Sequence, residues 1–516
     1  MSAPALAGAR RAAARRRARW GAAVTGVAAL GWGSPGCGYE VSPLGCAGLA
    51  GDELARCEAD RRCWGLSGAE LAQCEAGGGG AGGSSAQGAG GAGGSVMGSA
   101  GLGGSGAGGG GLVCSAPAID CDGTCVDVTA SDAANCGVCG RSCLGAATCS
   151  AGACVPEALA TSEVAPYALA DDGTYLYWVS PAIRAGGSVN DAKMRRVTKA
   201  NAGGAAQNAF ASTIVRARSL AFAGGKLVWG DLGTGPADTN QNLFAGTPGA
   251  ALPDNPPIAA AQLGVQHVAV GANKLFWSAA NDAAVRGKPP VGGTIAPNIL
   301  GQTNPSWVAA DAEGVPYWVA GVPPEVRRSK ASPPNTAEPV ASGTTIVAVE
   351  LAGGRFYWAE RAVGTVQSRP KGSPGAPPRA EFGGRGTVEG FAVVVAGAGG
   401  AGGAGGAAGA GGAGGAGGAG GAGGAGGAPG GVTLYVLTAQ ARQLKAWRKG
   451  PEDAEPFLLG EVAAKKDPYY AAGNPFGAAY VVVDDQYVYF ADVGTVDTTP
   501  DVDTSEGDGI VYRVAR

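Results

Sequence analysis

A motif of a small-residue segment, a turn and an aromatic segment recurs along the chain from residue 156 onward. In its five clearest copies the aromatic segment ends at a tryptophan, and successive tryptophans are 51, 48, 41 and 40 residues apart. A period of 40–50 residues with β-type segments and glycine turns is typical of propeller blades. The five segments are Leu176-Tyr-Trp178, Leu227-Val-Trp229, Leu275-Phe-Trp277, Pro316-Tyr-Trp318 and Phe356-Tyr-Trp358.

Two further copies are degenerate, and the first of them follows an insertion. These copies end at Val436 and Phe490, and the step from Trp358 to Val436 is 78 residues. Residues 397–431 are almost entirely glycine and alanine, and leaving out these 35 residues restores a step of 43. We therefore expect the insert to enlarge a hairpin turn between two strands of one blade, where added length costs little.

The seven copies predict an all-β chain with a seven-bladed propeller over residues 156–516. The last blade has no fourth strand of its own, because the chain ends at Arg516. The segment Glu157-Ala-Leu-Ala160, before the first copy, matches the fourth-strand pattern. We expect it to pair with the last blade and to close the ring, which removes two exposed sheet edges.

The N-terminus is typical of an export signal. Six arginines precede a short, weakly apolar stretch from Trp20 to Gly33, and no apolar run reaches the length of a membrane span. Residues 1–36 are thus predicted to be a signal peptide. Cys37 follows directly, and thirteen cysteines cannot all pair, so a lipid on Cys37 would leave twelve for disulfides. The alternative is an ordinary signal peptide with Cys37 free or paired to another chain.

Charge and histidine content exclude several functions. Removal of residues 1–36 leaves 32 basic and 41 acidic residues, a net charge of −9, so we expect no nucleic acid as a partner. The whole chain has a single histidine, His267, so the sequence excludes metal sites built from several histidines. At the start of an inner strand, such a histidine is expected to be structural.

Residues 37–76 contain a short repeat with the pattern C-x-G-L-x-G-x-E-L-x-x-C. Good helix formers within it predict a helical hairpin, and a segment this short needs covalent staples. Exported cysteines favour disulfides over a four-thiolate metal site. The cysteines are Cys46, Cys57, Cys63 and Cys74. Residues 77–113, rich in Gly, Ala and Ser, are predicted to be a tether.

A second module is predicted over residues 114–155, and its eight cysteines fall within the 41 residues from Cys114 to Cys154. This density predicts four structural bridges of open pairing, in preference to zinc or redox chemistry at the C-x-x-C of Cys136 and Cys139. Asp127, Asp132 and Asn135 are predicted to stabilise turns rather than bind calcium. The cysteines are Cys114, Cys121, Cys125, Cys136, Cys139, Cys143, Cys149 and Cys154.

Two resemblances bear on function. The run from Cys125 through Asp132-Ala-Ala-Asn-Cys136 to Cys154 resembles a cysteine-rich module of myxobacterial surface proteins. The Leu-Tyr-Trp strands followed by a Val-x-Arg strand resemble the YWTD-type propellers of lipoprotein-receptor ectodomains, which have six blades and the Thr-Asp that this chain lacks. The second resemblance implies a binding or scaffold role and transfers no functional residue.

Long connections between second and third strands indicate where binding would occur. They fall in blades one, two and seven, which become neighbours when the ring closes, together with the long entry to blade seven at 461–475. Alternate oxygen donors at Asp501, Asp503 and Ser505 suit calcium, although a solvated acidic loop is the preferred interpretation. The candidate binding residues are Asp231, Asp238, Tyr469, Tyr470, Asp492, Asp497, Asp501, Asp503, Glu506 and Asp508, with the two tyrosines either exposed contacts or packed beneath the loop.

These features predict a non-catalytic, exported protein of the outer membrane or cell surface. We expect a monomer that needs no cofactor apart from the optional calcium, touches the membrane only through its lipid, and binds an envelope or extracellular protein or glycan. Two alternatives are a calcium-dependent propeller enzyme of the lactonase or lyase type and a purely structural envelope component. The enzyme would need a metal or an acid–base group in the central channel, where the inner strands offer mostly alanine and valine.

Overall fold

The structure is a computed structural model of the chain. It describes residues 112–130, 132–180, 192–200, 202–210, 217–231, 241–251, 253–254, 256–290, 293–330, 335–395, 431–440, 443–464, 480–495 and 507–516. All of these belong to one compact unit. The predicted signal peptide, Cys37, the hairpin repeat with its four cysteines, and the tether up to residue 111 lie outside the described residues.

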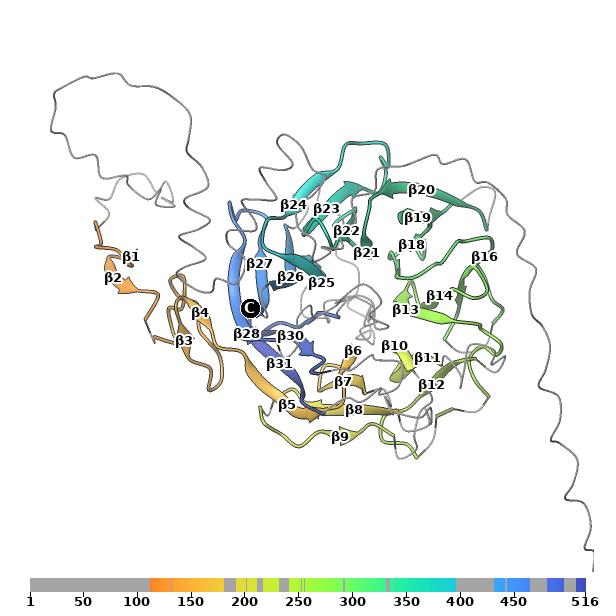
Figure 1. The fold of residues 1–516 in the computed structure, drawn as a ribbon, viewed down its shortest axis with the longest axis horizontal. Coiled ribbons are helices and arrows are strands. Elements are labelled where there is room, and N and C mark those ends of the chain that lie inside the picture. Colours follow the sequence, from red (N-terminus) through yellow and green to blue (C-terminus); the bar gives the residue numbers. More distant parts are fainter. Residues whose placement is uncertain are drawn as a thin grey trace, which may run out of the picture. The chain divides into compact units, whose positions relative to one another are not determined.

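Seven antiparallel sheets follow one another along the described chain and form a ring (Figure 1). The predicted seven-bladed propeller is therefore confirmed. Blade two has three described strands and a single further bridge between Leu243 and Ala259. In ring order, the blades consist of β6 (Tyr167–Asp171), β7 (Tyr175–Ser180), β8 (Lys193–Thr198) and β9 (Gln207–Asn208); β10 (Ala217–Ala223), β11 (Lys226–Asp231) and β12 (Leu243–Gly246); β13 (Val265–Gly271), β14 (Lys274–Ala279), β15 (Ala284–Lys288) and β16 (Asn298–Ile299); β17 (Val308–Ala310), β18 (Pro316–Ala320), β19 (Glu325–Ser329) and β20 (Ala337–Ser342); β21 (Ile346–Ala352), β22 (Arg355–Glu360), β23 (Thr365–Pro370) and β24 (Arg379–Phe382); β25 (Thr387–Val395), β26 (Val432–Gln440), β27 (Gln443–Lys449) and β28 (Phe457–Ala463); and β29 (Val482–Val483), β30 (Tyr487–Asp492) and β31 (Gly509–Ala515) with β5 (Glu157–Glu163).

The second strand of each blade is buried on both faces because a neighbouring blade covers each side. This explains why these strands are continuous apolar runs and do not alternate between apolar and polar residues. The five repeated tryptophans are fully buried, in agreement with the expectation that they pack between blades. They are Trp178, Trp229, Trp277, Trp318 and Trp358.

The two ends of the propeller are joined within blade seven. Strand β5 pairs antiparallel with β31, with Glu157 opposite Arg513 and Ala160 opposite Val511. The predicted closure by Glu157–Ala160 is therefore confirmed, and the paired segment extends to Glu163. A buried ion pair between Glu157 Oε2 and Arg513 Nη2, 2.6 Å apart, lies at this seam.

The glycine–alanine insert leaves the sheet of blade six intact. Strands β25 and β26 pair in register up to Val395 opposite Val432, close to both ends of the undescribed segment. The insert therefore lies, in sequence, between two strands that pair as a hairpin, and its own residues 396–430 lie outside the described residues. Among the described residues, no helix has the length and apolar character needed to cross a bilayer.

A repeated polar contact joins consecutive blades, and the sequence analysis did not anticipate it. A Glu or Gln, at the end of the outer strand of one blade or between it and the inner strand of the next, accepts a hydrogen bond from the indole N–H of the next blade's tryptophan. An arginine on the third strand donates to the same side chain. The indole contacts are Trp178 to Glu163 (3.1 Å), Trp277 to Gln262 (3.0 Å) and Trp318 to Gln302 (3.2 Å), and the arginines are Arg195, Arg286 and Arg327.

Replacing tryptophan by phenylalanine should cost more at Trp318 than at Trp358. Both are buried at equivalent positions, but the Trp358 indole nitrogen has no hydrogen-bond partner among the described residues, whereas Trp318 donates to Gln302. Gln302 would keep its contact from Arg327, so the expected cost is that of one lost hydrogen bond, roughly 0.5–1.5 kcal/mol. Chemical denaturation of the two variants measures the difference. Equal losses would mean that the Gln302 contact contributes nothing.

The cysteine-rich module forms two small hairpins, β1 (Ala118–Cys121) with β2 (Thr124–Asp127) and β3 (Cys149–Ser150) with β4 (Ala153–Cys154). Its eight cysteines form four disulfides, as predicted. Asp127 and Asp132 accept hydrogen bonds from backbone N–H groups two residues ahead, which is the turn role expected of them. The pairs are Cys114–Cys125, Cys121–Cys139, Cys136–Cys149 and Cys143–Cys154.

Candidate functional site

Three aromatic rings meet at the centre of the propeller. His267 lies on β13, Trp307 directly precedes β17, and Tyr480 lies two residues before β29. The centroid of His267 is 4.0 Å from that of Trp307 and 5.7 Å from that of Tyr480, and the latter two are 5.1 Å apart. Blades three and seven are not neighbours, so His267 and Tyr480 meet only across the ring. Three buried side chains from different blades are therefore in contact with one another at this level.

His267 is a neutral, buried imidazole. Its Nδ1 accepts a hydrogen bond from the backbone N–H of Val308 in the next blade, at 3.2 Å. The proton of the neutral ring therefore resides on Nε2, which has no partner among the described residues. Burial lowers the pKa of His267 to about 3, and the contact with Val308 only partly offsets this. The expected structural role of this histidine is met, with one polar atom left unsatisfied.

A carboxyl group lies beside this aromatic cluster. Glu350, on β21, is only 7% exposed, and its Oε1 has no hydrogen-bond partner among the described residues. Burial raises the pKa of Glu350 to about 8. The indole of Trp307 partly offsets the shift, although its geometry falls short of a hydrogen bond. Glu350 is therefore largely protonated at neutral pH.

A second buried carboxyl group lies on the inner strand of blade six. Glu389, on β25, accepts a hydrogen bond from the Thr387 hydroxyl at 3.0 Å and lies 3.5 Å from Arg361. Burial raises its pKa to about 7, and the positive charge of Arg361 opposes this shift.

The expectation that alanine and valine line the centre is incomplete. The inner strands also carry His267, Glu350 and Glu389, and the aromatic rings of Trp307 and Tyr480 lie just outside strand ends. A single charged residue inside an otherwise apolar inner strand, as in Ile346–Ala352, was the available signal. Glu350 and His267 are both at least 93% buried in this structure.

The long connections leave adjacent blades at one end of the sheets. They join β7 to β8, β11 to β12 and β30 to β31, so each links a second strand to a third. Blade one contacts blade two through β6 and β10, and it contacts blade seven through β6 and β29. The predicted adjacency of blades seven, one and two is therefore confirmed. It is confirmed for the bases of these connections, meaning the described strand ends where the connections begin and end.

Three of the candidate binding residues are described, and all three lie at these bases. Asp231 and Asp492 are the last residues of β11 and β30, and both are buried. Asp508 accepts hydrogen bonds from the backbone N–H (2.7 Å) and the hydroxyl (2.9 Å) of Thr495. This contact ties the two ends of the blade-seven connection together. The other candidates, Asp238, Tyr469, Tyr470, Asp497, Asp501, Asp503, Ser505 and Glu506, lie outside the described residues.

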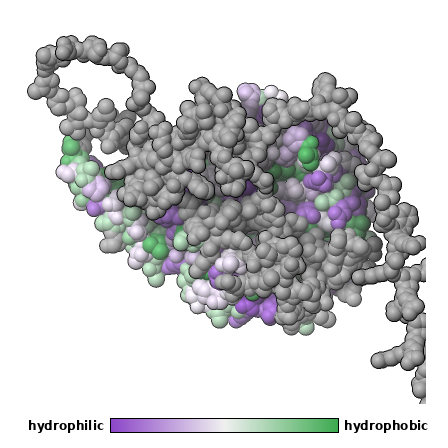
Figure 2. All heavy atoms as spheres, viewed as in Figure 1, coloured by the Kyte–Doolittle hydropathy of each residue, from purple (hydrophilic) through white to green (hydrophobic). Residues whose placement is uncertain are grey.

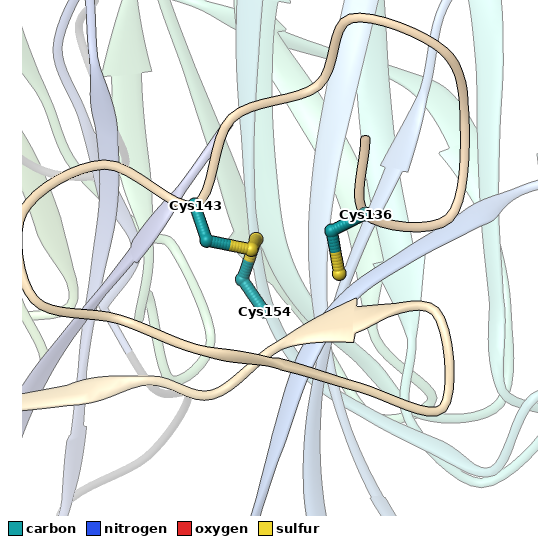
Figure 3. A group of neighbouring side chains, drawn as sticks. All are labelled: Cys136, Cys143 and Cys154. Atoms are coloured by element: carbon teal, nitrogen blue, oxygen red, sulfur yellow. A yellow bond between two sulfur atoms is a disulfide. The ribbon is translucent and has the colours of Figure 1, made fainter. Parts of the chain in front are cut away.

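Three cysteine sulfurs form a tight group in the module. Those of Cys136, Cys143 and Cys154 lie within 4.8 Å of one another (Figure 3). Figure 3 shows Cys143 bonded to Cys154, and Cys136 is bonded to Cys149. The group therefore consists of two adjacent disulfides. The C-x-x-C cysteines pair with different partners, Cys149 and Cys121, so they do not form a redox pair with one another.

The most exposed apolar side chains of the described propeller lie at the same end as the long connections. Val322 (81% exposed) and Val363 (59%) lie in the turns between second and third strands of blades four and five. Leu300 (59%) follows the outer strand of blade three. Elsewhere, the described surface visible in Figure 2 mixes hydrophilic and hydrophobic residues.

Comparisons with known proteins concern the fold. No protein-family model matches the chain, and no curated protein matches its sequence. Among solved structures, a nidogen/laminin complex is similar at 12% identity over 56% of this chain and 97% of that chain, with a TM-score of 0.32. PQQ-bound aldose sugar dehydrogenase from Streptomyces coelicolor has 14% identity over 56% and 95%, with a TM-score of 0.36. YCF48 bound to D1 peptide has 10% identity over 70% and 94%, with a TM-score of 0.40. At these values neither a residue role nor an activity is transferred.

Proposed function

We propose that this protein is an exported, non-catalytic surface protein that uses its propeller to recognise a protein or a glycan. Propellers bind ligands either at the centre of the ring or on the connections at one end of it. The observation that carries the proposal is the contrast between these two regions in this protein. In the described centre, buried aromatic rings from three blades contact one another. One end of the ring carries the long connections of blades seven, one and two as well as the exposed Leu300, Val322 and Val363. Function concentrates on loops that a rigid scaffold holds.

The sequence resemblances favour the same assignment. The resemblance to myxobacterial surface modules and the arginine-rich N-terminus support export, with Cys37 as the lipid anchor and residues 77–113 as the tether. Calcium bound at Asp501, Asp503 and Ser505 would order the blade-seven connection.

Replacement of residues 496–506 by a short Gly-Ser linker tests this assignment. The variant keeps Thr495 and Asp508, so the base of the connection retains its hydrogen bonds. We expect binding to a glycan array and a panel of purified envelope proteins to fall at least tenfold. If calcium orders the connection, the chelator EGTA should weaken binding to the unmodified protein.

A matched control shortens the insert at 397–431 to a two-residue turn. This turn lies at the opposite end of blade six, because it joins first and second strands. Binding by the control should equal that of the unmodified protein. Unchanged binding after replacement of 496–506 would refute the assignment of this loop, and hydrolysis of lactone substrates would favour the enzyme instead.

A further inference from the structure

The inner half of the cysteine-rich module packs against the propeller at the closure seam. Arg141, which is only 8% exposed, extends from the module to the backbone of two blades. Its Nη2 donates to the carbonyl oxygen of Leu459 on β28 at 2.8 Å and to that of Ala515 on β31 at 3.3 Å. Its guanidinium group lies 4.6 Å from the ring centroid of Phe457. One side chain thus joins the module to blades six and seven.

Glycines on both sides permit this close approach. A Cβ on Gly137 of the module would lie 2.6 Å from the ring of Phe457 and 2.2 Å from the carbonyl oxygen of Gly152. A Cβ on Gly460 of β28 would lie 2.6 Å from the carbonyl oxygen of Cys154. A larger residue at either position would require backbone movement, so the two surfaces are complementary.

The module also holds the residue that pairs across the seam. The carboxylate of Glu157 accepts a hydrogen bond from the backbone N–H of Ala146 at 2.8 Å through Oε1. Its other oxygen, Oε2, accepts from Nε of Arg513 at 2.7 Å. Glu157 therefore connects the module loop, the closing strand β5 and the last strand β31.

The four disulfides differ in their relation to the propeller. The cysteines of the inner pair of bridges, Cys136–Cys149 and Cys143–Cys154, are buried and belong to the same apolar cluster as the propeller core. The outer bridges, Cys114–Cys125 and Cys121–Cys139, are partly or fully exposed at each cysteine. Arg141 lies between Cys136 and Cys143, so the inner bridges fix both ends of its loop.

We propose that the module is a clasp on ring closure: the inner disulfides hold Arg141 and the 145–146 turn against the propeller and so keep β5 paired with β31. The stability of a ring closed by pairing of the two chain ends is limited by the strand that detaches most easily. Local detachment of that strand exposes two sheet edges. The clasp acts on this strand from outside the sheet. The module is therefore part of the propeller's closing device as well as a preceding domain.

Two disulfide variants of the full chain separate the clasp from a general disulfide effect. Both the Cys143–Cys154 and the Cys114–Cys125 bridges span 11 residues, so their removal relaxes the unfolded chain equally. We expect C143S/C154S to accelerate amide hydrogen exchange in Glu157–Glu163 and Gly509–Ala515 at least tenfold. C114S/C125S should leave exchange in both strands unchanged.

A second variant keeps all cysteines. Arg141→Ala should likewise accelerate exchange in β5, β31 and β28, while exchange in the strands of blade four stays at its original rate. Equal exchange in β5 and β31 for both disulfide variants would overturn the proposal. Unchanged exchange in β5 and β31 for Arg141→Ala would also overturn the proposal. This test remains decisive if C143S/C154S fails to fold.

Discussion

Glu350→Gln is expected to stabilise the protein above pH 8 by on the order of 5 kcal/mol, and to change its stability little near pH 5. The pKa of Glu350 is about 8 in the folded state, against an ordinary value of 4.5. The folded state therefore holds a proton that the unfolded chain releases, and the protein loses stability as pH rises from 4.5 to 8. Each unit of difference corresponds to about 1.4 kcal/mol. Glutamine stays neutral and removes this loss.

His267→Asn provides the matching test with the opposite sign. The pKa of His267 is about 3 in the folded state and 6.5 ordinarily, so the protein loses stability as pH falls from 6.5 to 3. Asparagine keeps an acceptor for the backbone N–H of Val308 and should abolish that acid-side loss. Urea unfolding of each variant and of the unmodified protein from pH 3 to pH 9 measures the stability gained by Glu350→Gln at high pH and by His267→Asn at low pH. A constant difference between Glu350→Gln and the unmodified protein across this range would show that folding does not raise the pKa of Glu350.

The blades could be predicted from the sequence because their signal is local and repeated. Each second strand, such as Leu176-Tyr-Trp178, is buried on both faces by the same neighbouring elements, so similar residues recur at similar spacing. The closing strand could be predicted because the last blade lacked a fourth strand and the segment before the first blade matched one. In the structure, β5 pairs with β31 as that prediction required. The glycine–alanine insert was recognisable because its removal restored the period.

The centre and the closure seam could not be predicted in the same way. His267, Trp307 and Tyr480 belong to three blades and meet only when the ring is closed, so no local spacing relates them. The same holds for Arg141, whose acceptors on Leu459 and Ala515 lie more than 300 residues away. The cysteine spacing predicted four bridges but contained no information about the surface that the inner bridges face.

Arg513→Ala is expected to be among the most destabilising single substitutions in the propeller. The Arg513–Glu157 pair has side-chain exposures of 6% and 11%, and Arg513 also lies 4.4 Å from the ring centroid of Tyr487. Removal of one partner of a buried ion pair typically costs about 3–5 kcal/mol, and Glu157 would keep only its hydrogen bond from Ala146 as compensation. Thermal and urea unfolding should show this loss as a lower midpoint with an unchanged denaturant slope.

Two further variants separate the ion pair from general effects of substitution. Arg513→Met with Glu157→Gln removes both charges and keeps an acceptor for Ala146, so it should recover most of the lost stability. Lys445→Ala breaks the more exposed pair with Glu461, at 21% and 44% exposure, and should cost under about 1 kcal/mol. If Arg513→Ala cost no more than Lys445→Ala, closure of the ring would depend on the backbone pairing of β5 with β31 and the packing around it, with no net contribution from the charges at the seam.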